Sequence, residues 1–293
     1  MESDKTNIPF SNSPLRGAGG AIAIQGYEGS FHEEAARKFF GEVEIIPCNT
    51  FREVVKIASS KSESTGGVMA IENSIAGSIL PNYSLLQKSN LAIIGEVYLH
   101  IRQHLLVNPG VQLSDIKEVH SHPMALLQCL DYLEKHPWKL VETEDTALSA
   151  KSLQRYHSKH TAAIAGKLAA QLYNLEILTA DIHTLKNNYT RFLVLQRKEA
   201  AISVEDANKA SIYFETDHTK GSLAKVLTKI AAKKINLSKL QSMPIPGSDF
   251  KYGFYADMDI KNRKEVEQVL ASIEALTNNL KVFGVYKQGS IKK

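Results

Sequence analysis

The sequence predicts an α/β protein made of a larger region and a smaller C-terminal unit. Between residues 21 and 200, short apolar stretches alternate with amphipathic stretches of helical spacing. This alternation indicates a parallel or mixed sheet with helices on both faces. After a polar connector at 198–208, the order changes to βαββαβ, which is the order of a ferredoxin-like unit.

The elements of the larger region follow from their apolar spacing and from the polar residues that bound them. Strands are expected at 21–24, 43–47, 68–71, 91–96, 105–107, 117–120, 140–143 and 161–165, and helices at 31–40 and 50–60. In the C-terminal unit, strands are expected at 209–214 and 280–285, a hairpin at 237–244 and 252–259, and helices at 222–233 and 264–277. Two regions are therefore expected, divided near residue 205.

The bulk composition is that of a globular enzyme-sized chain. Its 293 residues are 43% hydrophobic and 23% charged, with a net charge of +4, so about two domains are expected. The small charge argues against nucleic acid, and no apolar run reaches the ~18 residues of a membrane span. Cys48 and Cys129 form neither a disulfide framework nor a C-x-x-C site, which favours the cytoplasm.

Residues 1–20 are expected to be a flexible leader, because they combine prolines and glycines and lack an apolar core. Lys5 and Arg16 are their only basic residues, fewer than a transit peptide would usually carry.

Polar residues gather where predicted strands end, which is where ligands bind in such sheets. The turn before the first helix carries Ser30 and Phe31, and helix N-termini favour anions. A simple tight turn is the alternative. Asn73, Ser74 and Gly77 follow the third strand and offer neutral donors and close backbone approach; the alternative is a helix cap.

The segment 120–129 carries a His-x-His pair, His120 and His122, which suggests zinc. No third ligand is evident, so we expect no metal. Ser121 as a helix cap before Pro123 is the more natural interpretation.

Asn188 opens the last polar segment, which continues with Thr190, Arg191 and Phe192. Alternation along a strand would place Thr190 and Phe192 on one face. Arg191 would then tie the scaffold, paired with a carboxylate, or reach round the edge.

Together these segments resemble the prephenate dehydratase family over nearly the whole chain after the leader. The family's patterns match at Gly26, Gly29, Phe31 and Ala35, at 71–77, at 121–129, at Thr146-Ala147 and at 188–192. Tyr27, Ser30 and His32 depart from the family's usual residues, and His32 has no assigned role.

The resemblance implies conversion of prephenate to phenylpyruvate in L-phenylalanine biosynthesis, with loss of water and carbon dioxide and with no cofactor. Thr190 would bond the departing hydroxyl, Phe192 would form an apolar wall, and Glu72 would donate a proton if burial raised its pKa, or be structural. The candidate catalytic residues are Thr190, Arg191, Phe192 and Glu72. The candidate substrate-binding residues are Ser30, Phe31, Asn73, Ser74, Gly77, Ser121, His122, Gln128 and Thr146.

The resemblance also implies a bilobal fold like that of type 2 periplasmic binding proteins. The lobes would be 21–97 with 184–200, and 98–183, with hinges near 96–99 and 182–186. Residues 208–288 resemble an ACT regulatory domain that binds L-phenylalanine in a homodimer or homotetramer. The effector would contact Gly221, Ser222, Leu223 and Ala224, and Gln241, Ser242, Met243 and Pro244, where two charges of the family element are absent.

Three alternatives remain open. Arogenate dehydratase differs in substrate by an amino group in place of a ketone. A non-catalytic amino-acid sensor would use the same bilobal fold but would not need Thr190. A purely structural scaffold carrying the C-terminal unit fits less well still.

Overall fold

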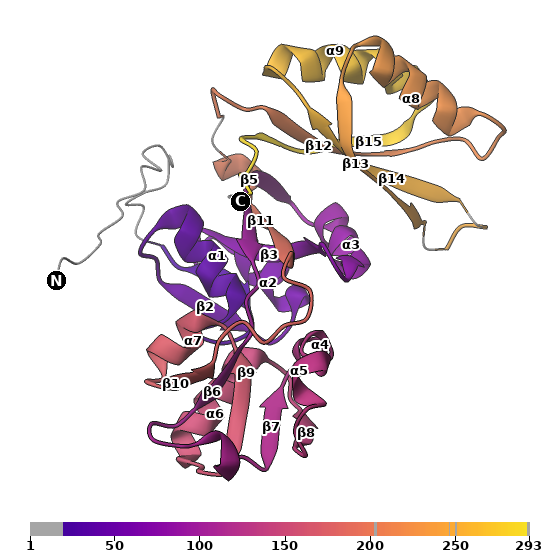
Figure 1. Cartoon of the computed structure of the whole chain (residues 1–293). Helices are drawn as coiled ribbons and strands as arrows, with labels where there is room; N and C mark the ends of the chain where they lie inside the picture. Colours follow the sequence, from indigo (N-terminus) through magenta and orange to yellow (C-terminus); the bar gives the residue numbers. More distant parts are fainter. Residues whose placement is uncertain (1–19, 202–203, 246, 250, 292–293) are drawn as a thin grey trace.

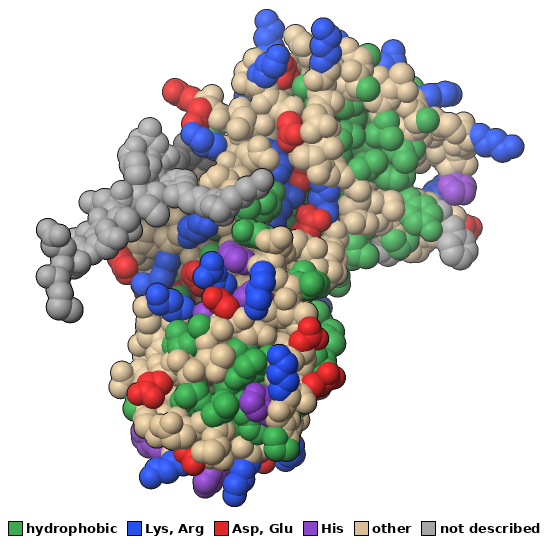
Figure 2. Space-filling model, in the orientation of Figure 1, with side chains coloured by type: hydrophobic (Ala, Val, Ile, Leu, Met, Phe, Trp, Pro, Cys, Tyr) green, Lys and Arg blue, Asp and Glu red, His purple; other side chains and the backbone are tan. Residues whose placement is uncertain are grey.

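The computed structural model describes residues 20–201, 204–245, 247–249 and 251–291, so nearly all of the expected leader lies outside the described residues. The described chain forms three sheets (Figure 1). Two belong to the larger region, and the third is formed by the C-terminal unit. On the face seen in Figure 2, basic and acidic side chains are interspersed. No helix among the described residues is long and apolar enough to cross a membrane.

The first sheet has the strand order β2-β1-β3-β11-β5, with β4 paired to β3. Its strands are β1 (Ile22–Gln25), β2 (Ile45–Cys48), β3 (Gly66–Asn73), β4 (Gly77–Ser78), β5 (Leu91–His100) and β11 (Tyr189–Arg197). Strands β1 and β3 are parallel, whereas β11 runs antiparallel to both β3 and β5. The start of β11 therefore lies at the same edge of the sheet as the ends of β1 and β3.

The second sheet has the order β10-β6-β9-β7-β8. Its strands are β6 (His104–Val107), β7 (Glu118–Ser121), β8 (Lys139–Glu142), β9 (Thr161–Ala165) and β10 (Glu176–Thr179). The chain enters this sheet through residues 101–103 and returns to the first through 180–188. These crossings lie a few residues beyond the first expected hinge and around the second.

The helices begin and end at residues that satisfy their free backbone groups. The helix α1 (Phe31–Phe40) is capped by the Ser30 side chain and ends at Gly41, whose φ is 83°. The remaining helices of the larger region are α2 (Phe51–Ala58), α3 (Leu80–Lys88), α4 (Pro123–Gln128), α5 (Leu130–Leu133), α6 (Thr146–Tyr156) and α7 (Lys167–Leu172), with short 3₁₀ turns at Leu113–Asp115 and Lys198–Ala200.

The C-terminal unit has the expected βαββαβ order and the strand order β13-β14-β12-β15. Its elements are β12 (Lys209–Glu215), α8 (Ser222–Ala232), β13 (Asn236–Pro244), β14 (Tyr252–Asp259), α9 (Arg263–Ile273), a 3₁₀ turn (Glu274–Leu276) and β15 (Asn278–Tyr286). Helices α8 and α9 cover one face of this sheet (Figure 1). Residues 246 and 250 of the expected hairpin turn lie outside the described residues.

The two faces of the first sheet bury different partners. Phe192 and Val194 pack with α1 in one core, whereas Leu193 and Leu195 share a second core with Tyr213 and other residues of the C-terminal unit. The contact is close: a Cβ on Gly284 would lie 2.0 Å from the Ile93 carbonyl oxygen. Strand β11 is thus enclosed from both sides.

Candidate active site

Thr190 lies beside Asn73 at the edge of the first sheet that faces the second. The two residues are cross-strand partners on β11 and β3. The Asn73 Nδ2 group donates to the Thr190 Oγ1 at 3.0 Å. No group among the described residues accepts a bond from the Thr190 hydroxyl, so its proton is available to a ligand.

The Asn73 carboxamide also organises the turn that follows β3. Its Oδ1 accepts the backbone N–H groups of Ile75 and Ala76 at 2.9 and 2.8 Å. The Ser74 Oγ accepts the Tyr189 N–H at 2.9 Å and thereby ties this turn to β11. Asn73 and Ser74 are therefore engaged in positioning the turn after β3 and the start of β11, next to Thr190. Gly77 adopts a φ of 82°, which a residue with a side chain would resist.

A neutral chain of hydrogen bonds links this edge to the second sheet. Asn73 Nδ2 donates to the Asn188 Oδ1 at 2.7 Å. The Asn188 amide in turn donates to the Gln128 Oε1 at 3.0 Å. Gln128 is the last residue of α4. The chain of hydrogen bonds therefore brings three predicted site residues together: Gln128, Asn73 and Thr190.

The glycine turn before α1 packs against the second sheet. A Cβ on Gly26 would lie 2.7 Å from the Asp145 Oδ2, and one on Gly29 would lie 2.9 Å from the Ala169 Cα. Both glycines have positive φ. The Gly29 N–H is already bonded to the Glu33 carboxylate at 2.6 Å, so it is not free for the anion that this turn was expected to bind.

Ser30 and Phe31 have local roles that the sequence suggested only in part. The Ser30 hydroxyl accepts the Glu33 N–H at 3.4 Å as the cap of α1 and is buried. The Phe31 ring lies against Gly166, at the start of α7, where a Cβ would approach within 2.9 Å. Phe31 therefore packs between α1 and the start of α7, which pack against the two different sheets of the larger region.

Asp145 was missed in the sequence, although it directly precedes the predicted Thr146. Its Oδ1 caps α6 by accepting the N–H groups of Ala147 and Leu148 at 2.7 and 3.0 Å. Burial raises the pKa of Asp145 despite these bonds. Its Oδ2 is directed toward Gly26, so a carboxyl group with a raised pKa meets the edge that carries Thr190. Its place directly before the matched Thr146-Ala147 pair was the signal that could have identified it.

Ser121 and His122 differ from expectation. The Ser121 hydroxyl is fully buried and donates to the Ile164 carbonyl at 2.7 Å. The cap of α4 is His122, whose Nδ1 accepts the Met124 N–H at 3.2 Å. His120 bonds to Glu118. No group of three potential metal ligands occurs among the described residues.

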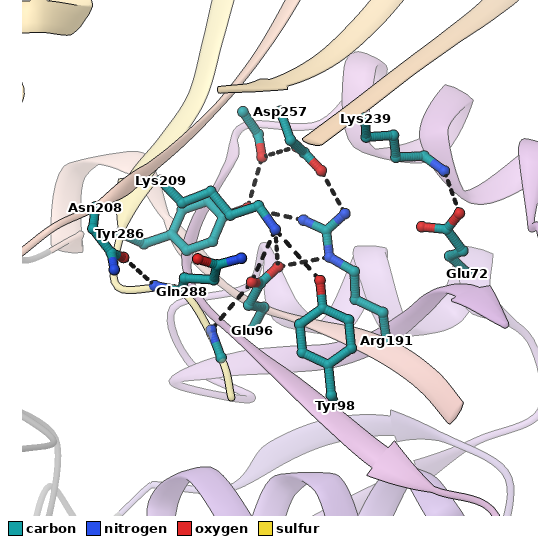
Figure 3. Close-up of polar contacts among 12 residues, drawn as sticks. Glu72, Glu96, Tyr98, Arg191, Asn208, Lys209, Lys239, Asp257, Tyr286 and Gln288 are labelled. Atoms are coloured by element: carbon teal, nitrogen blue, oxygen red, sulfur yellow. Dashed lines mark hydrogen bonds and ion pairs between the residues drawn. The ribbon is translucent and has the colours of Figure 1, made fainter. Parts of the chain in front are cut away.

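Arg191 points toward the C-terminal unit (Figure 3). Thr190, its neighbour on β11, points to the other face of the sheet. The Arg191 Nε bonds to the Glu96 carboxylate at 2.6 Å, its Nη1 to the Asp257 carboxylate at 2.5 Å and its Nη2 to the Tyr286 hydroxyl at 3.0 Å. Each of the three guanidinium nitrogens has a partner there. The geometry thus gives Arg191 the scaffold role and does not support the catalytic one.

Glu72 also lies on the face of the first sheet that contacts the C-terminal unit. Its Oε1 accepts from the Lys239 Nζ at 2.6 Å, and its side chain is 35% exposed. A proton donor would need burial without a cation beside it. The predicted role of Glu72 as a proton donor is therefore not supported by its surroundings.

Phe192 is 2% exposed and lies beneath the site rather than lining it. Its ring meets the His32 ring edge-on, with centroids 5.0 Å apart. The His32 Nε2 accepts the Ala70 N–H at 3.3 Å, and burial lowers the pKa of His32 to about 3. His32 is therefore a neutral packing and acceptor group.

In the C-terminal unit, one of the two predicted effector elements lines a cavity. Residues 221–224 line a cavity of about 400 Å³ together with Tyr252 and Phe254. Gln241 to Pro244 are not among its lining residues, and Met243 packs instead against the core shared with the first sheet. A single chain therefore brings only the first element to the cavity.

Comparison with known proteins places the chain among its relatives. The family model described as prephenate dehydratase matches residues 22–200. Prephenate dehydratase from Methanocaldococcus jannaschii is 35% identical, covering 88% of this chain and 95% of the relative. Arogenate dehydratase/prephenate dehydratase 2 from Arabidopsis thaliana is 36% identical, covering 94% and 75%.

Two solved structures are similar over most of their length. One is described as prephenate dehydratase from Arthrobacter aurescens in complex with L-Phe, with a TM-score of 0.81, 28% identity, and 91% and 90% of the two chains covered. The other is GqqA, described as a novel type of quorum quenching acylase, with a TM-score of 0.83, 27% identity, and 92% and 98% covered. Family model and relatives together show that this chain belongs to the prephenate dehydratase family.

Proposed function

We propose that this chain is a carbon–oxygen lyase that converts prephenate to phenylpyruvate, water and carbon dioxide, with Thr190 as its central catalytic group. Family membership supports the reaction. The observation that carries the assignment of Thr190 is its bond from Asn73, which orients the hydroxyl and leaves its proton to donate.

In this reaction the electron pair of the ring–carboxylate bond moves into the ring as the ring–hydroxyl bond breaks. The carboxylate leaves as carbon dioxide, and the hydroxyl leaves as water after gaining a proton. Negative charge grows on the departing oxygen, so a bond from Thr190 strengthens in the transition state. A threonine hydroxyl is too weak an acid to give up its proton there.

For the proton we propose Asp145 in place of Glu72. Burial raises the pKa of Asp145, which is the direction that a general acid requires. Its position against Gly26 supports a role at the edge that holds Thr190. The hydroxyl of Thr146, the His122 ring and the backbone near Ser30 remain candidates for contacts with the substrate carboxylates.

We further propose two lobes like those of type 2 periplasmic binding proteins, one around each of the first two sheets, and an ACT regulatory domain at 208–288. The βαββαβ order and the cavity at 221–224 support an effector site, and L-Phe in a related structure suggests its ligand. Gln241 to Pro244 would complete that site from a second chain in a homodimer or homotetramer. Hydrophobic side chains gather on the C-terminal unit in Figure 2, as pairing would require.

The test is a phenylpyruvate assay of wild type, Thr190→Ala and Thr190→Ser with prephenate, and with arogenate in parallel. Loss of a preorganised donor should lower kcat of Thr190→Ala about 10²–10³-fold, whereas Thr190→Ser keeps the donor. Unchanged turnover in Thr190→Ala would refute the assignment of Thr190. Turnover of arogenate alone would move the substrate to that alternative, and an acylase assay on the same sample tests the activity described for GqqA.

A further inference from the structure

Two ion pairs connect the C-terminal unit to β3 and β11, the strands that carry Asn73 and Thr190 (Figure 3). Both pairs lie on the face of the first sheet opposite the Thr190 side chain. Lys239 on β13 donates to Glu72 at 2.6 Å and to the Ser78 hydroxyl at 2.8 Å. Asp257 on β14 binds Arg191. Each pair therefore joins the C-terminal sheet to a different strand of the first sheet.

The contacted residues are the immediate neighbours of the candidate catalytic pair. Glu72 precedes Asn73 on β3, and Arg191 follows Thr190 on β11. Glu72 and Arg191 are themselves cross-strand partners, as are Asn73 and Thr190. Fixing Glu72 and Arg191 therefore fixes the backbone that aims the Asn73 amide at the Thr190 hydroxyl.

The ion pair of Arg191 belongs to a balanced buried network. Glu96 is fully buried and binds both Arg191 and Lys209, the latter at 3.0 Å, while Asp257 accepts from Ser211 at 2.5 Å. Two cations and two anions thus face one another. Because an uncompensated buried charge is strongly unfavourable, the network specifies one docked position of the C-terminal sheet.

The Lys239–Glu72 pair is less buried, with side-chain exposures of 12% and 35%. Lys239 and Asp257 are cross-strand partners on β13 and β14. The Lys239–Glu72 and Asp257–Arg191 pairs are therefore coupled through the C-terminal sheet. Since the Lys239 pair is partly solvated, its loss leaves the fold intact and can be tested by substitution.

We propose that Lys239 and Asp257 are positioning residues for the dehydratase: through Glu72 and Arg191 they hold β3 and β11 so that Asn73 orients the Thr190 hydroxyl. This inference rests on the proposed function. It makes the C-terminal unit part of the arrangement that sets kcat, and it predicts a signature at Asn73 that does not depend on turnover.

The main variant is Lys239→Met in the full chain, with Lys229→Met as the matched control, because Lys229 is exposed on α8 of the same unit. Small misplacements of reacting groups have large kinetic effects, so kcat of Lys239→Met should fall about tenfold with KM nearly unchanged. The charge-exchanged double variant Glu72→Lys/Lys239→Glu should recover most of this loss. Lys229→Met should match wild type.

Amide hydrogen exchange of the turn after β3 provides the readout without substrate. The Ile75 and Ala76 amides, which bond to Asn73, should exchange faster in Lys239→Met than in Lys229→Met. If wild type proves inactive toward prephenate and arogenate, the proposed function fails while exchange still decides the positioning role.

Two results would overturn the inference. One is a Lys239→Met protein with wild-type kcat and wild-type exchange at this turn. The other is a loss of kcat that the charge-exchanged variant does not recover, because the ion pair would then not be its cause. Asp257→Asn, which keeps the shape of the side chain, should lower kcat in the same direction as Lys239→Met; a wild-type kcat in this variant would remove Asp257 from the proposal.

Discussion

The two faces of β11 place neighbouring residues in opposite chemical surroundings. Toward the second sheet, Thr190 joins a neutral chain that continues through Asn73 and Asn188. Toward the C-terminal unit, Arg191 bonds to the Glu96 and Asp257 carboxylates and to the Tyr286 hydroxyl. The side chains of successive strand residues point to opposite faces, so one residue step separates the proposed catalytic hydroxyl from a structural charge.

The difference shows how a strand can serve binding and assembly together. Neutral amides and hydroxyls can be oriented at modest desolvation cost and remain free to meet a charged substrate. Buried charges tolerate no such freedom, because each needs its partner in place. The neutral face therefore keeps the Thr190 hydroxyl proton available for a ligand, whereas the charged face admits one arrangement.

The largest expected effect comes from breaking the charged face. Arg191→Leu leaves the Glu96 and Asp257 carboxylates without their shared cation, and removing one partner of a buried ion pair costs about 3–5 kcal/mol. Urea denaturation should show this loss, with Arg155→Leu at an exposed helix position as control. A change below about 1 kcal/mol would mean that the network does not hold the sheets together.

On the neutral face, Asn73→Ala removes the acceptor of two backbone N–H groups and the donor to Thr190. The two N–H groups lie in an exposed turn, so the loss is that of several ordinary hydrogen bonds of about 0.5–1.5 kcal/mol each; stability should fall by this order and kcat should fall with it. The control is Ser59→Ala, which removes an exposed side-chain bond to a helix carbonyl without touching the site. A wild-type kcat in Asn73→Ala would show that Asn73 is not needed to orient the Thr190 hydroxyl.

A smaller effect is expected where the neutral edge meets the second sheet. Gly26→Ala combines a positive φ with a contact 2.7 Å from Asp145, whereas Gly41→Ala has a similar φ and open space around it. Left-handed backbone costs about 1–2 kcal/mol in both variants. Thermal unfolding should show a greater loss for Gly26→Ala, and equal losses would show that the contact with Asp145 is not restrictive.

The smallest effect is a pH dependence at the charged face. Although burial opposes ionisation, the Arg191 guanidinium and Lys209 hold the pKa of Asp257 below its ordinary value. A depressed folded-state pKa stabilises the protein above the unfolded value of about 3.9, and this contribution is lost as pH falls through the folded pKa. Unfolding measured from pH 5 downward should therefore depend less steeply on pH in Asp257→Asn, and a slope equal to wild type would exclude this linkage.

Much of the fold could be predicted from local patterns. The helix at 31–40 has its predicted bounds, because Ser30 and Gly41 mark its ends. Strand β5 runs on to His100, beyond the predicted end at residue 96, because β11 pairs with it along its whole length. Such an extension depends on a partner about a hundred residues away, which no local pattern contains.

For the site, the sequence revealed the polar segments and their order. It revealed only in part to which face of the sheet each side chain points. Alternation separated Arg191 from Thr190 and left two roles open for the arginine. Its partner Asp257 lies 66 residues later in the chain, so the choice needed tertiary structure. For Glu72, the deciding neighbour was Lys239, at a separation of 167 residues.

The burial of Lys209 against Glu96 has a consequence for how such chains can evolve. A recombination event that exchanged the C-terminal unit for one with an apolar residue at position 209 would leave Glu96 with Arg191 as its remaining cation. If instead a C-terminal unit with Lys209 were joined to a catalytic region without Glu96, the buried Lys209 ammonium group would lose its carboxylate partner. We therefore expect the two halves of the gene to vary as a matched set, with substitutions at positions 96 and 209 arising together.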